Sequence, residues 1–371
     1  MIPVRLALLI DSGFPMPTIE AMRITMRDIA AKAGVTHATV SMSLANNPSI
    51  PLATRNRIKA LAKTMGYQPN PYLSTLMRLR SRRRPLNEKP VIALVCAYDR
   101  PDGWRRAGPT IRQMREGAIE RAALRGYEAQ EFWLHQNGMS NARFSAMLHA
   151  RGIEGLLIGP LANNAQPPAL KWSDFAVVWL SVPSPLLTVT TVSNDHYLSS
   201  LQTIRQCRRL GYRRPGLVVL KSQHDRMQGR WEAAFVLEQR FLSGSEPVPP
   251  LLVEDEWKDY GLLEVWLKKY KPDVIITSIG ERLFTILQKN DWRIPEDIGL
   301  ANLACPENGQ RISGCYQNGK LTGATAMDAL ISMIERNEKG LPEQSVTLMI
   351  ESLWNPGKTL RDLAHPPAGE G

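Results

Sequence analysis

The sequence predicts a small all-α helix-turn-helix head, followed by an α/β body made of two lobes of doubly wound parallel sheet. Residues 24–70 hold three short helical patterns separated by turn residues. From residue 90 onward, apolar strand patterns alternate with amphipathic helix patterns, which is typical of parallel sheets covered by helices. The net positive charge comes from the N-terminal part of the chain. These three observations together give the fold class.

The composition narrows the classes of protein to which the chain can belong. Of its 371 residues, 43% are hydrophobic and 22% are charged, as in globular proteins of two or three domains. No apolar run reaches the ~18 residues that a membrane span needs, and the N-terminus lacks the marks of a signal peptide. The four cysteines show no metal-binding spacing. We therefore expect a cytoplasmic, nucleoid-associated protein that has no membrane partner, no metal and no cofactor.

The charge distribution separates two parts of the chain. Residues 22–84 hold twelve Lys and Arg and a single acidic residue. Their net charge therefore equals the net charge of +11 of the whole chain, and the charges of the remaining residues cancel. A basic segment attached to a neutral body predicts one region that meets a polyanion and another with a different task.

Residues 1–23 show no helical or strand period, and Met22 precedes the first predicted helix by a few residues. We expect this segment to be a disordered extension, or translation to start at Met22.

The caps of the first head helix predict where it begins and ends. Thr25 and Asp28 are spaced as in a capping box, in which each side chain bonds the other residue's backbone N–H. Ile29, Ala30 and Ala33 share one face. Gly34 tolerates the left-handed backbone that ends a helix.

Two more helices complete the head. Thr36 is the expected cap of a helix over Thr36–Ala45, and a third helix is expected from about residue 54 to 65, where Gly66 ends it. Their core residues are predicted to be Val40, Leu44, Ile58, Leu61, Ala62 and Met65. Two short helices about a glycine turn, braced by a third, form a helix-turn-helix; the alternative is a small helical bundle with a basic surface.

The second helix has the chemistry of a DNA-reading element. Its first residues are small and carry hydroxyl groups, so its backbone N–H groups can approach phosphate. His37, Ala38, Ser41 and Met42 fall on the predicted solvent side, where base edges would be met.

The head resembles the LacI/GalR (lactose repressor) family of bacterial transcriptional regulators. The shared pattern is T-x-x-D-I-A-x-x-A-G-V-T-x-x-T-V-S, then T-R-x-x-I and G-Y-x-P-N, and it runs without a gap from Thr25 to Leu76. The resemblance assigns phosphate contacts to Thr25, Thr36, Thr39 and Ser41, base contacts to His37, Ala38 and Met42, and a place among the DNA-binding residues to Asn46. Met42 stands where the family often has Arg; its apolar side chain favours a thymine methyl group over guanine.

A hinge is expected over residues 71–89, where Tyr72–Arg80 has helical spacing and basic residues follow. The resemblance places Leu76 where the family inserts a leucine wedge into the minor groove, which kinks the DNA; the alternative is that Leu76 packs against the body. Arg78 and Arg80 begin an arginine-rich run that is expected to contact phosphates, or to be a solvated linker.

The body alternates strand and helix patterns. Strands are predicted at 91–97, 128–134, 155–158, 175–182, 217–220 and 274–277, and helices at 110–125, 140–151, 196–210, 228–241 and 262–270. So many elements indicate two doubly wound lobes, with binding sites at the carboxyl ends of strands. Motifs of nucleotide-binding and hydrolytic enzymes are missing, so we do not expect an enzyme.

Local patterns in the body resemble the periplasmic-binding-protein-like effector domain of the same family, expected at 90–358 with a flexible tail at 359–371. This resemblance implies a two-lobed clamp for a small ligand. Arg226 or Arg230, ahead of Trp231, matches an arginine that grips the ligand, although a salt bridge at a helix start is an equal alternative. The remaining effector candidates are Asp99, Trp104 and Asp195; a surface loop is the alternative for the first two. The polar residues that usually hold sugar hydroxyls in this family, an Asn-Asp pair and an Asp, are replaced by Ile279-Gly280 and Asn302-Leu303-Ala304.

These inferences predict a regulator, more often a repressor in this family, that binds a pseudo-palindromic double-stranded operator as a homodimer and responds to a small molecule, expected to be a carbohydrate. The alternatives are a ligand-independent regulator with a degenerate effector site and a transport-type sugar-binding protein.

Overall fold

The computed structural model describes residues 24–44, 47, 49–67, 89–161, 166–180, 182, 186–241, 246–254, 257, 260–307, 309 and 311–365. The chain forms two compact units, Met1–Pro85 and Leu86–Gly371, which are described separately. The N-terminal extension, Asn46 and the expected hinge helix lie outside the described residues. No helix in the described part of the chain is long and apolar enough to cross a membrane.

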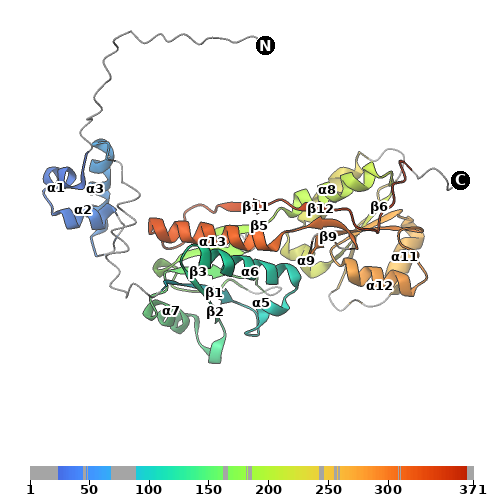
Figure 1. Ribbon diagram of the computed structural model, residues 1–371, viewed down its shortest axis with the longest axis horizontal. Coiled ribbons are helices and arrows are strands. Elements are labelled where there is room, and N and C mark those ends of the chain that lie inside the picture. The colour runs from blue at the N-terminus through green and yellow to red at the C-terminus, as the bar shows by residue number, and fades with distance from the viewer. Residues whose placement is uncertain are drawn as a thin grey trace, which may run out of the picture. The chain divides into compact units, whose positions relative to one another are not determined.

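The first unit contains three helices, α1 (Met26–Ala33), α2 (His37–Leu44) and α3 (Leu52–Thr64), drawn in blue in Figure 1. Their shared core is small and consists of Ile29, Ala30, Val40, Ile58 and Ala62. The three predicted helices are therefore confirmed, with ends that differ by one to two residues.

The predicted caps of α1 and α2 are present. The Thr25 hydroxyl accepts from the Asp28 backbone N–H at 3.4 Å, and the Asp28 carboxylate accepts from the Thr25 N–H at 2.7 Å. These bonds lower the pKa of Asp28. Gly34 ends α1 with a φ of +65°, and the Thr36 hydroxyl accepts from the Thr39 N–H at 3.1 Å at the start of α2.

The second unit is built on two six-stranded sheets (Figure 1). The first-lobe sheet runs in the order β11 (Thr347–Ile350), β5 (Thr190–Asn194), β4 (Ala176–Leu180), β3 (Gly155–Ile158), β1 (Val91–Cys96) and β2 (Glu128–Trp133). The second-lobe sheet runs in the order β12 (Leu353–Asn355), β10 (Ser313–Tyr316), β9 (Gly299–Cys305), β8 (Val274–Thr277), β6 (Pro215–Leu220) and β7 (Leu251–Val253). All pairs are parallel except β10 with β12.

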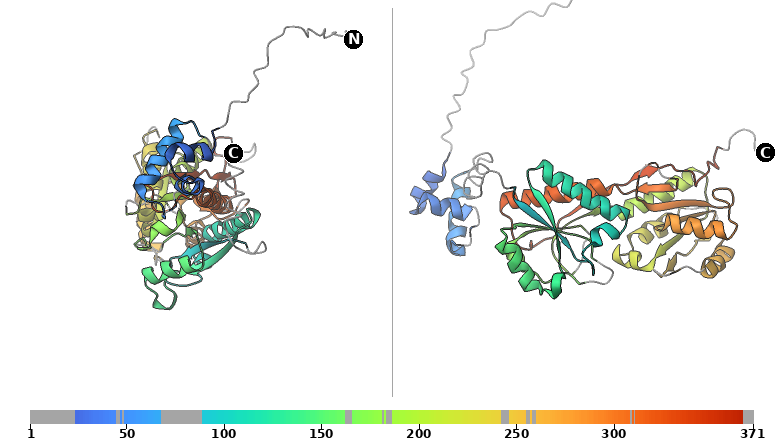
Figure 2. Two further views of the ribbon diagram at one scale, coloured as in Figure 1. Left: turned by 90° about the vertical axis from the view of Figure 1, so that its left-hand side faces the viewer. Right: turned by 60° about the horizontal axis from the view of Figure 1, so that its bottom comes forward.

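Helices cover both faces of each sheet, as the sequence predicts (Figure 2). The first lobe uses α5 (Gly103–Arg106), α6 (Pro109–Leu124), α7 (Asn141–Ala150) and α13 (Gly319–Arg336); the second uses α8 (His196–Arg209), α9 (Lys221–Arg226), α10 (Arg230–Gln239), α11 (Tyr260–Tyr270) and α12 (Gly280–Lys289). Along β1, Ile92 and Leu94 join one core cluster and Ala93 and Val95 the other. This two-residue alternation explains why parallel strands buried on both faces appear as unbroken apolar runs.

The chain crosses between the lobes at three points. It leaves the first lobe after β5 at Asn194 and enters α8 at His196, returns between Tyr316 and Gly319, and crosses again between β11 and β12. The second lobe also extends past residue 358, where the sequence predicted a flexible tail. Thr359 is buried and donates to the Leu300 carbonyl at 2.6 Å, so the start of that tail is packed.

Two glycines let α6 and α13 approach closely within the first lobe. A Cβ atom on Gly117 would lie 2.0 Å from the Lys320 carbonyl oxygen, and one on Gly323 would lie 1.8 Å from the Met114 carbonyl oxygen. Backbone atoms face each other at both places, so no side chain can move aside to make room.

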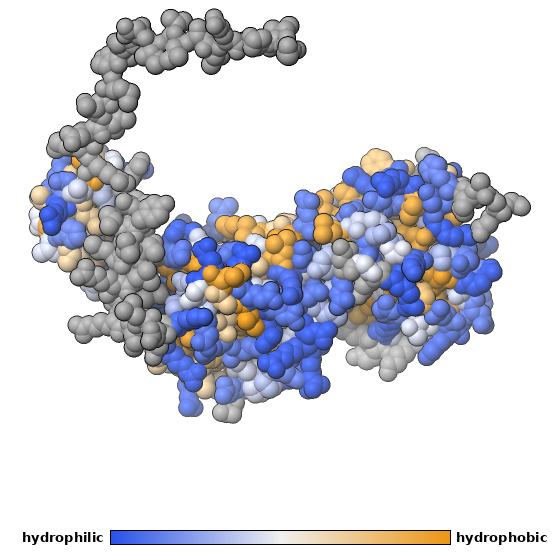
Figure 3. Space-filling model, in the orientation of Figure 1, coloured by the Kyte–Doolittle hydropathy of each residue, from blue (hydrophilic) through white to orange (hydrophobic). Residues whose placement is uncertain are grey.

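All four cysteines are free and buried. Apolar side chains are exposed along β11 and β12 (Figure 3), namely Val346, Leu348, Met349 and Leu353.

Candidate functional site

The exposed side of α2 is a candidate nucleic-acid interface. Val40 and Ser43 are buried in the head, whereas His37 and Ala38 are exposed. The side chains presented to solvent at the helix start are therefore small or able to form hydrogen bonds. Such a surface admits a close approach to the groove of a duplex.

The threonines at the start of α2 form a local pair. The Thr36 and Thr39 hydroxyls lie 2.9 Å apart, and Thr36 also accepts from the Thr39 N–H. Met42 is half-buried, and its sulfur accepts from the Ser49 hydroxyl at 3.9 Å. The thioether thus has a fixed contact with the turn that precedes α3.

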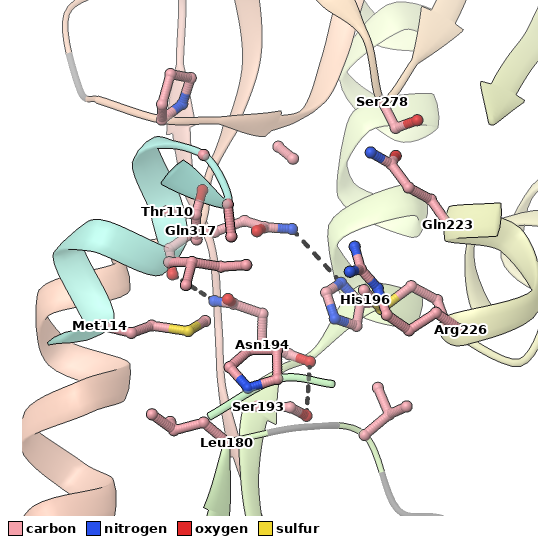
Figure 4. Close-up of a pocket in the computed structure, with 18 of the residues that line it drawn as sticks. Thr110, Met114, Leu180, Ser193, Asn194, His196, Gln223, Arg226, Ser278 and Gln317 are labelled. Carbon is pink, nitrogen blue, oxygen red and sulfur yellow. Dashed lines mark hydrogen bonds between the residues drawn. The ribbon is translucent and has the colours of Figure 1, made fainter. Parts of the chain in front are cut away.

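A cavity of about 260 Å³ lies between the two lobes of the second unit. This volume lies just below the range of ~300–1,000 Å³ that is usual for ligand pockets. Its walls include the start of α6, residues at the ends of β4, β5, β8 and β9, and parts of α8, α9 and α10. Thr110 and Met114 face His196 and Arg226 across it (Figure 4). The cavity therefore sits at the carboxyl ends of parallel strands, where such folds bind ligands.

Several polar groups in this cavity are bonded to one another. The Asn194 side-chain N–H donates to the Gln317 carbonyl, and the Gln317 amide nitrogen lies 3.4 Å from Nδ1 of His196. The His196 ring meets Trp231 edge-on, with centroids 5.2 Å apart. These contacts fix the walls where the chain crosses between lobes.

Other polar atoms of the lining have no hydrogen-bond partner among the described residues. They are Asn194 Oδ1, Gln223 Oε1, Ser278 Oγ, Arg226 Nε and Trp231 Nε1. Buried polar atoms are rarely left unpaired, because each lost hydrogen bond costs ~1–3 kcal/mol. Such a set converging on one cavity indicates a binding site.

The electrostatic environment of the cavity is positive. Burial and, to a lesser extent, the charges of Arg226 and Arg230 together lower the pKa of His196 to about 3. Burial raises the pKa of the nearby Tyr98 to about 12. Both side chains are therefore neutral at pH 7, and the charge of the lining comes from Arg226.

Comparison with known proteins identifies the head. Residues 25–70 match the family model described as "Bacterial regulatory proteins, lacI family". Residues 25–70 therefore form a LacI-family DNA-binding head. The relatives it resembles carry the names of transcriptional regulators rather than enzymes.

Two curated relatives show how far this similarity extends. The HTH-type transcriptional repressor CytR of Escherichia coli is 28% identical over 223 residues, which are 56% of this chain and 58% of CytR. This chain thus spans less than two thirds of CytR. The HTH-type transcriptional repressor MelR of Bacillus subtilis is 26% identical over 343 residues, covering 88% of this chain and 94% of MelR.

Two solved structures confirm the LacI-type fold. A complex of the transcriptional regulator CelR with cellobiose matches with a TM-score of 0.55 and 17% identity, over 91% of this chain and 100% of that chain. A lac repressor dimer bound to operator and the anti-inducer ONPF matches with a TM-score of 0.51 and 14% identity, over 91% and 99%.

The effector residues that the sequence predicts fall in different places. Arg226 and Trp231 line the cavity, and Arg230 lies close enough to influence His196. Asp195 does not line it; its carboxylate caps α8 by accepting from the Leu198 N–H at 2.9 Å. Asp99 is exposed in the loop after β1 and also lies off the lining.

Trp104 differs most from its expected place. The sequence suggested a cleft residue or a surface loop, but Trp104 is wholly buried in the core of the first lobe. Its large apolar ring fills the space beneath α5. This core position could not be seen from the sequence. Seven polar residues of the described lining were missed, Thr110, Ser193, Asn194, His196, Gln223, Ser278 and Gln317; the position of Ser278 directly after β8 was the available signal.

Proposed function

We propose that the chain is a sequence-specific DNA-binding repressor that acts as a homodimer on a pseudo-palindromic operator and is modulated by a small molecule bound between the lobes of the second unit. One observation carries the proposal: the same chain combines a helix-turn-helix head with a two-lobed body whose cavity presents unpartnered polar atoms. The relatives CytR and MelR are named repressors, which favours repression.

In this proposal the start of α2 meets the DNA. Phosphates are contacted by the Thr25, Thr36, Thr39 and Ser41 hydroxyls, and base edges by His37, Ala38 and Met42. The exposure of His37 and Ala38 supports these roles. Asn46, Leu76, Arg78 and Arg80, which lie outside the described residues, complete the proposed interface.

The proposed division of labour follows the expected domains. Residues 24–70 bind DNA, 71–89 form the hinge and 90–358 form the effector and dimerisation domain, with 1–23 and 359–371 as terminal segments. A dimer supplies two heads for two half-sites related by a two-fold axis. The exposed apolar side chains along β11 and β12 support a surface that a second copy covers. Such a protein would act in the cytoplasm, at the nucleoid.

The effector is proposed to be carbohydrate-like and no larger than a small sugar, because the cavity is small. The match to a CelR–cellobiose complex supports this class. A ligand-independent regulator is disfavoured by the unpartnered lining atoms, and a transport protein has no use for a DNA-binding head.

The test is selection of DNA from a random library by the purified full-length protein. The expected result is one enriched two-fold symmetric site. The variant Ala38→Glu places a carboxylate on the exposed face of α2 and should abolish enrichment, because it repels phosphate. Ala60→Glu makes the same change on the exposed side of α3 and is the matched control, which should keep it. Absence of a symmetric site, or equal loss in both variants, would contradict the proposal.

A further inference from the structure

The described lining of the cavity carries positive charge and no negative charge. Its twenty-one described residues include the guanidinium of Arg226 but no Asp or Glu. Residues 162–165, 181 and 183–185, which follow the lining strands β3 and β4, contain no acidic residue in the sequence either. No carboxylate of the chain is therefore available in these segments to balance the charge.

The acidic side chains nearest in sequence are already engaged elsewhere. Asp195 caps α8. Asp225 pairs with Lys221 at 2.5 Å, and Glu232 pairs with His224 at 3.3 Å. Arg226 has no ion pair among the described residues, and its Nε is buried without a partner. A half-buried guanidinium without a counter-ion is costly, and an anion from solution would offset that cost.

The opposite wall of the cavity also favours negative charge. The sixteen-residue helix α6 begins there, with Pro109 at its first position and Gly108 offering no side-chain cap. Free backbone N–H groups at a helix start carry a partial positive charge.

Two buried side chains of the lining point independently to a ligand. Trp231 is 3% exposed, and its indole N–H has no partner in the part of the chain that the structure describes. Asn194 is 2% exposed and its Oδ1 accepts no bond. One donor and one acceptor are thus available for uncharged polar groups of the same ligand, such as hydroxyls.

From these contacts, and resting on the function proposed above, we propose that the effector carries an anionic group, a carboxylate or a phosphate, that pairs with Arg226. Its uncharged polar part bonds Trp231 and Asn194. A neutral sugar would leave the guanidinium unpaired. The ligand class is therefore a small polyhydroxylated acid or a sugar phosphate.

The first test uses inorganic phosphate and acetate as probes, with sodium chloride at matched ionic strength. Thermal unfolding of the full-length chain is the measurement. At least one of the two anions should raise the melting temperature more than chloride does. Arg226→Gln should remove the difference and Arg226→Lys should keep part of it. Arg209→Gln, an exposed position on α8 in the same lobe, is the matched control and should behave as wild type. Equal effects of all three salts, or a difference that survives in Arg226→Gln, would overturn the proposal.

The second test separates the two anionic groups. Monosaccharides are compared with their own sugar acids and their own 6-phosphates by calorimetric titration. The acid or the phosphate should bind roughly tenfold to a hundredfold more tightly than its neutral parent. A parent sugar that binds as tightly as both derivatives would refute the anionic class, while the DNA selection above would still test the proposed function. If no sugar derivative binds, the inorganic anions decide alone.

Discussion

The close packing of α6 on α13 decides whether the substitution Gly323→Ala stabilises or destabilises the protein. Gly323→Ala adds a single methyl group in the interior of α13. On an open helix surface this change stabilises a protein by ~1 kcal/mol, because alanine is the better helix former. Here the added Cβ would lie 1.8 Å from the Met114 carbonyl oxygen and 2.6 Å from its carbonyl carbon. Real Cβ atoms do not come so close to backbone, so the two helices must move apart.

Overpacking of this kind costs about 1–3 kcal/mol. After subtracting the gain in helix propensity, we expect Gly323→Ala to lower the free energy of unfolding of the second unit by up to ~2 kcal/mol. Urea denaturation followed by tryptophan fluorescence measures this directly. Glu335→Ala on the same helix is the control: its side chain is largely exposed and lies 3.9 Å from Arg125, so a change within about 0.5 kcal/mol is expected. A stabilised Gly323→Ala protein would refute the close approach of the two helices.

Two further predictions concern the head and the hinge. Thr25→Ala should lower the stability of the head by about 1 kcal/mol at neutral pH, because the helix cap is lost. The hydrogen bonds from Thr25 lower the pKa of Asp28 from its usual value of 3.8. Their contribution to the stability of the head is therefore complete above pH 3.8 and is lost as the pH falls through the lower pKa of the folded state. Melting of the head followed by circular dichroism should show a smaller difference between the two proteins at acid pH, and an unchanged difference would contradict the capping box. Leu76→Ala should weaken operator binding by roughly tenfold or more while non-specific binding changes little; equal losses in fluorescence-anisotropy titrations with operator and random DNA would exclude the wedge.

The head could be predicted from sequence because local rules decide it. Thr25, Gly34 and Thr36 act within a few residues of their own position, and the structure places their hydrogen bonds and left-handed turn as those rules require. The doubly wound body was also predictable, because a strand buried on both faces, such as β1, appears in the sequence as an unbroken apolar run. Helix α13 was not identified, because buried residues occur on much of its surface and leave no clear amphipathic period.

The cavity could not be predicted residue by residue, because its walls are assembled across long sequence distances. His196 and Gln317 lie 121 residues apart and meet where two crossings between the lobes run side by side. Trp104 shows the opposite error: its place in a loop suggested an effector contact or a surface position, but packing beneath α5 buries it completely. Charge and residue type along the chain carry no information on either arrangement.

The crossings also explain how a ligand would act on the body of the protein. Asn194 ends β5 and bonds Gln317 just before α13, so two of the three connections between the lobes are tied together in the wall of the cavity. Across the same cleft, the Gln113 side chain on α6 donates to the Pro306 carbonyl of the second lobe at 2.6 Å. A ligand shifts a conformational equilibrium only by contacting the alternative arrangements differently. Because this cavity is lined by both lobes and by their connections, any change in the angle between the lobes alters those contacts. The helix α6, which lines the cavity at one end and packs on α13 along its length, then transmits such a change into the first lobe.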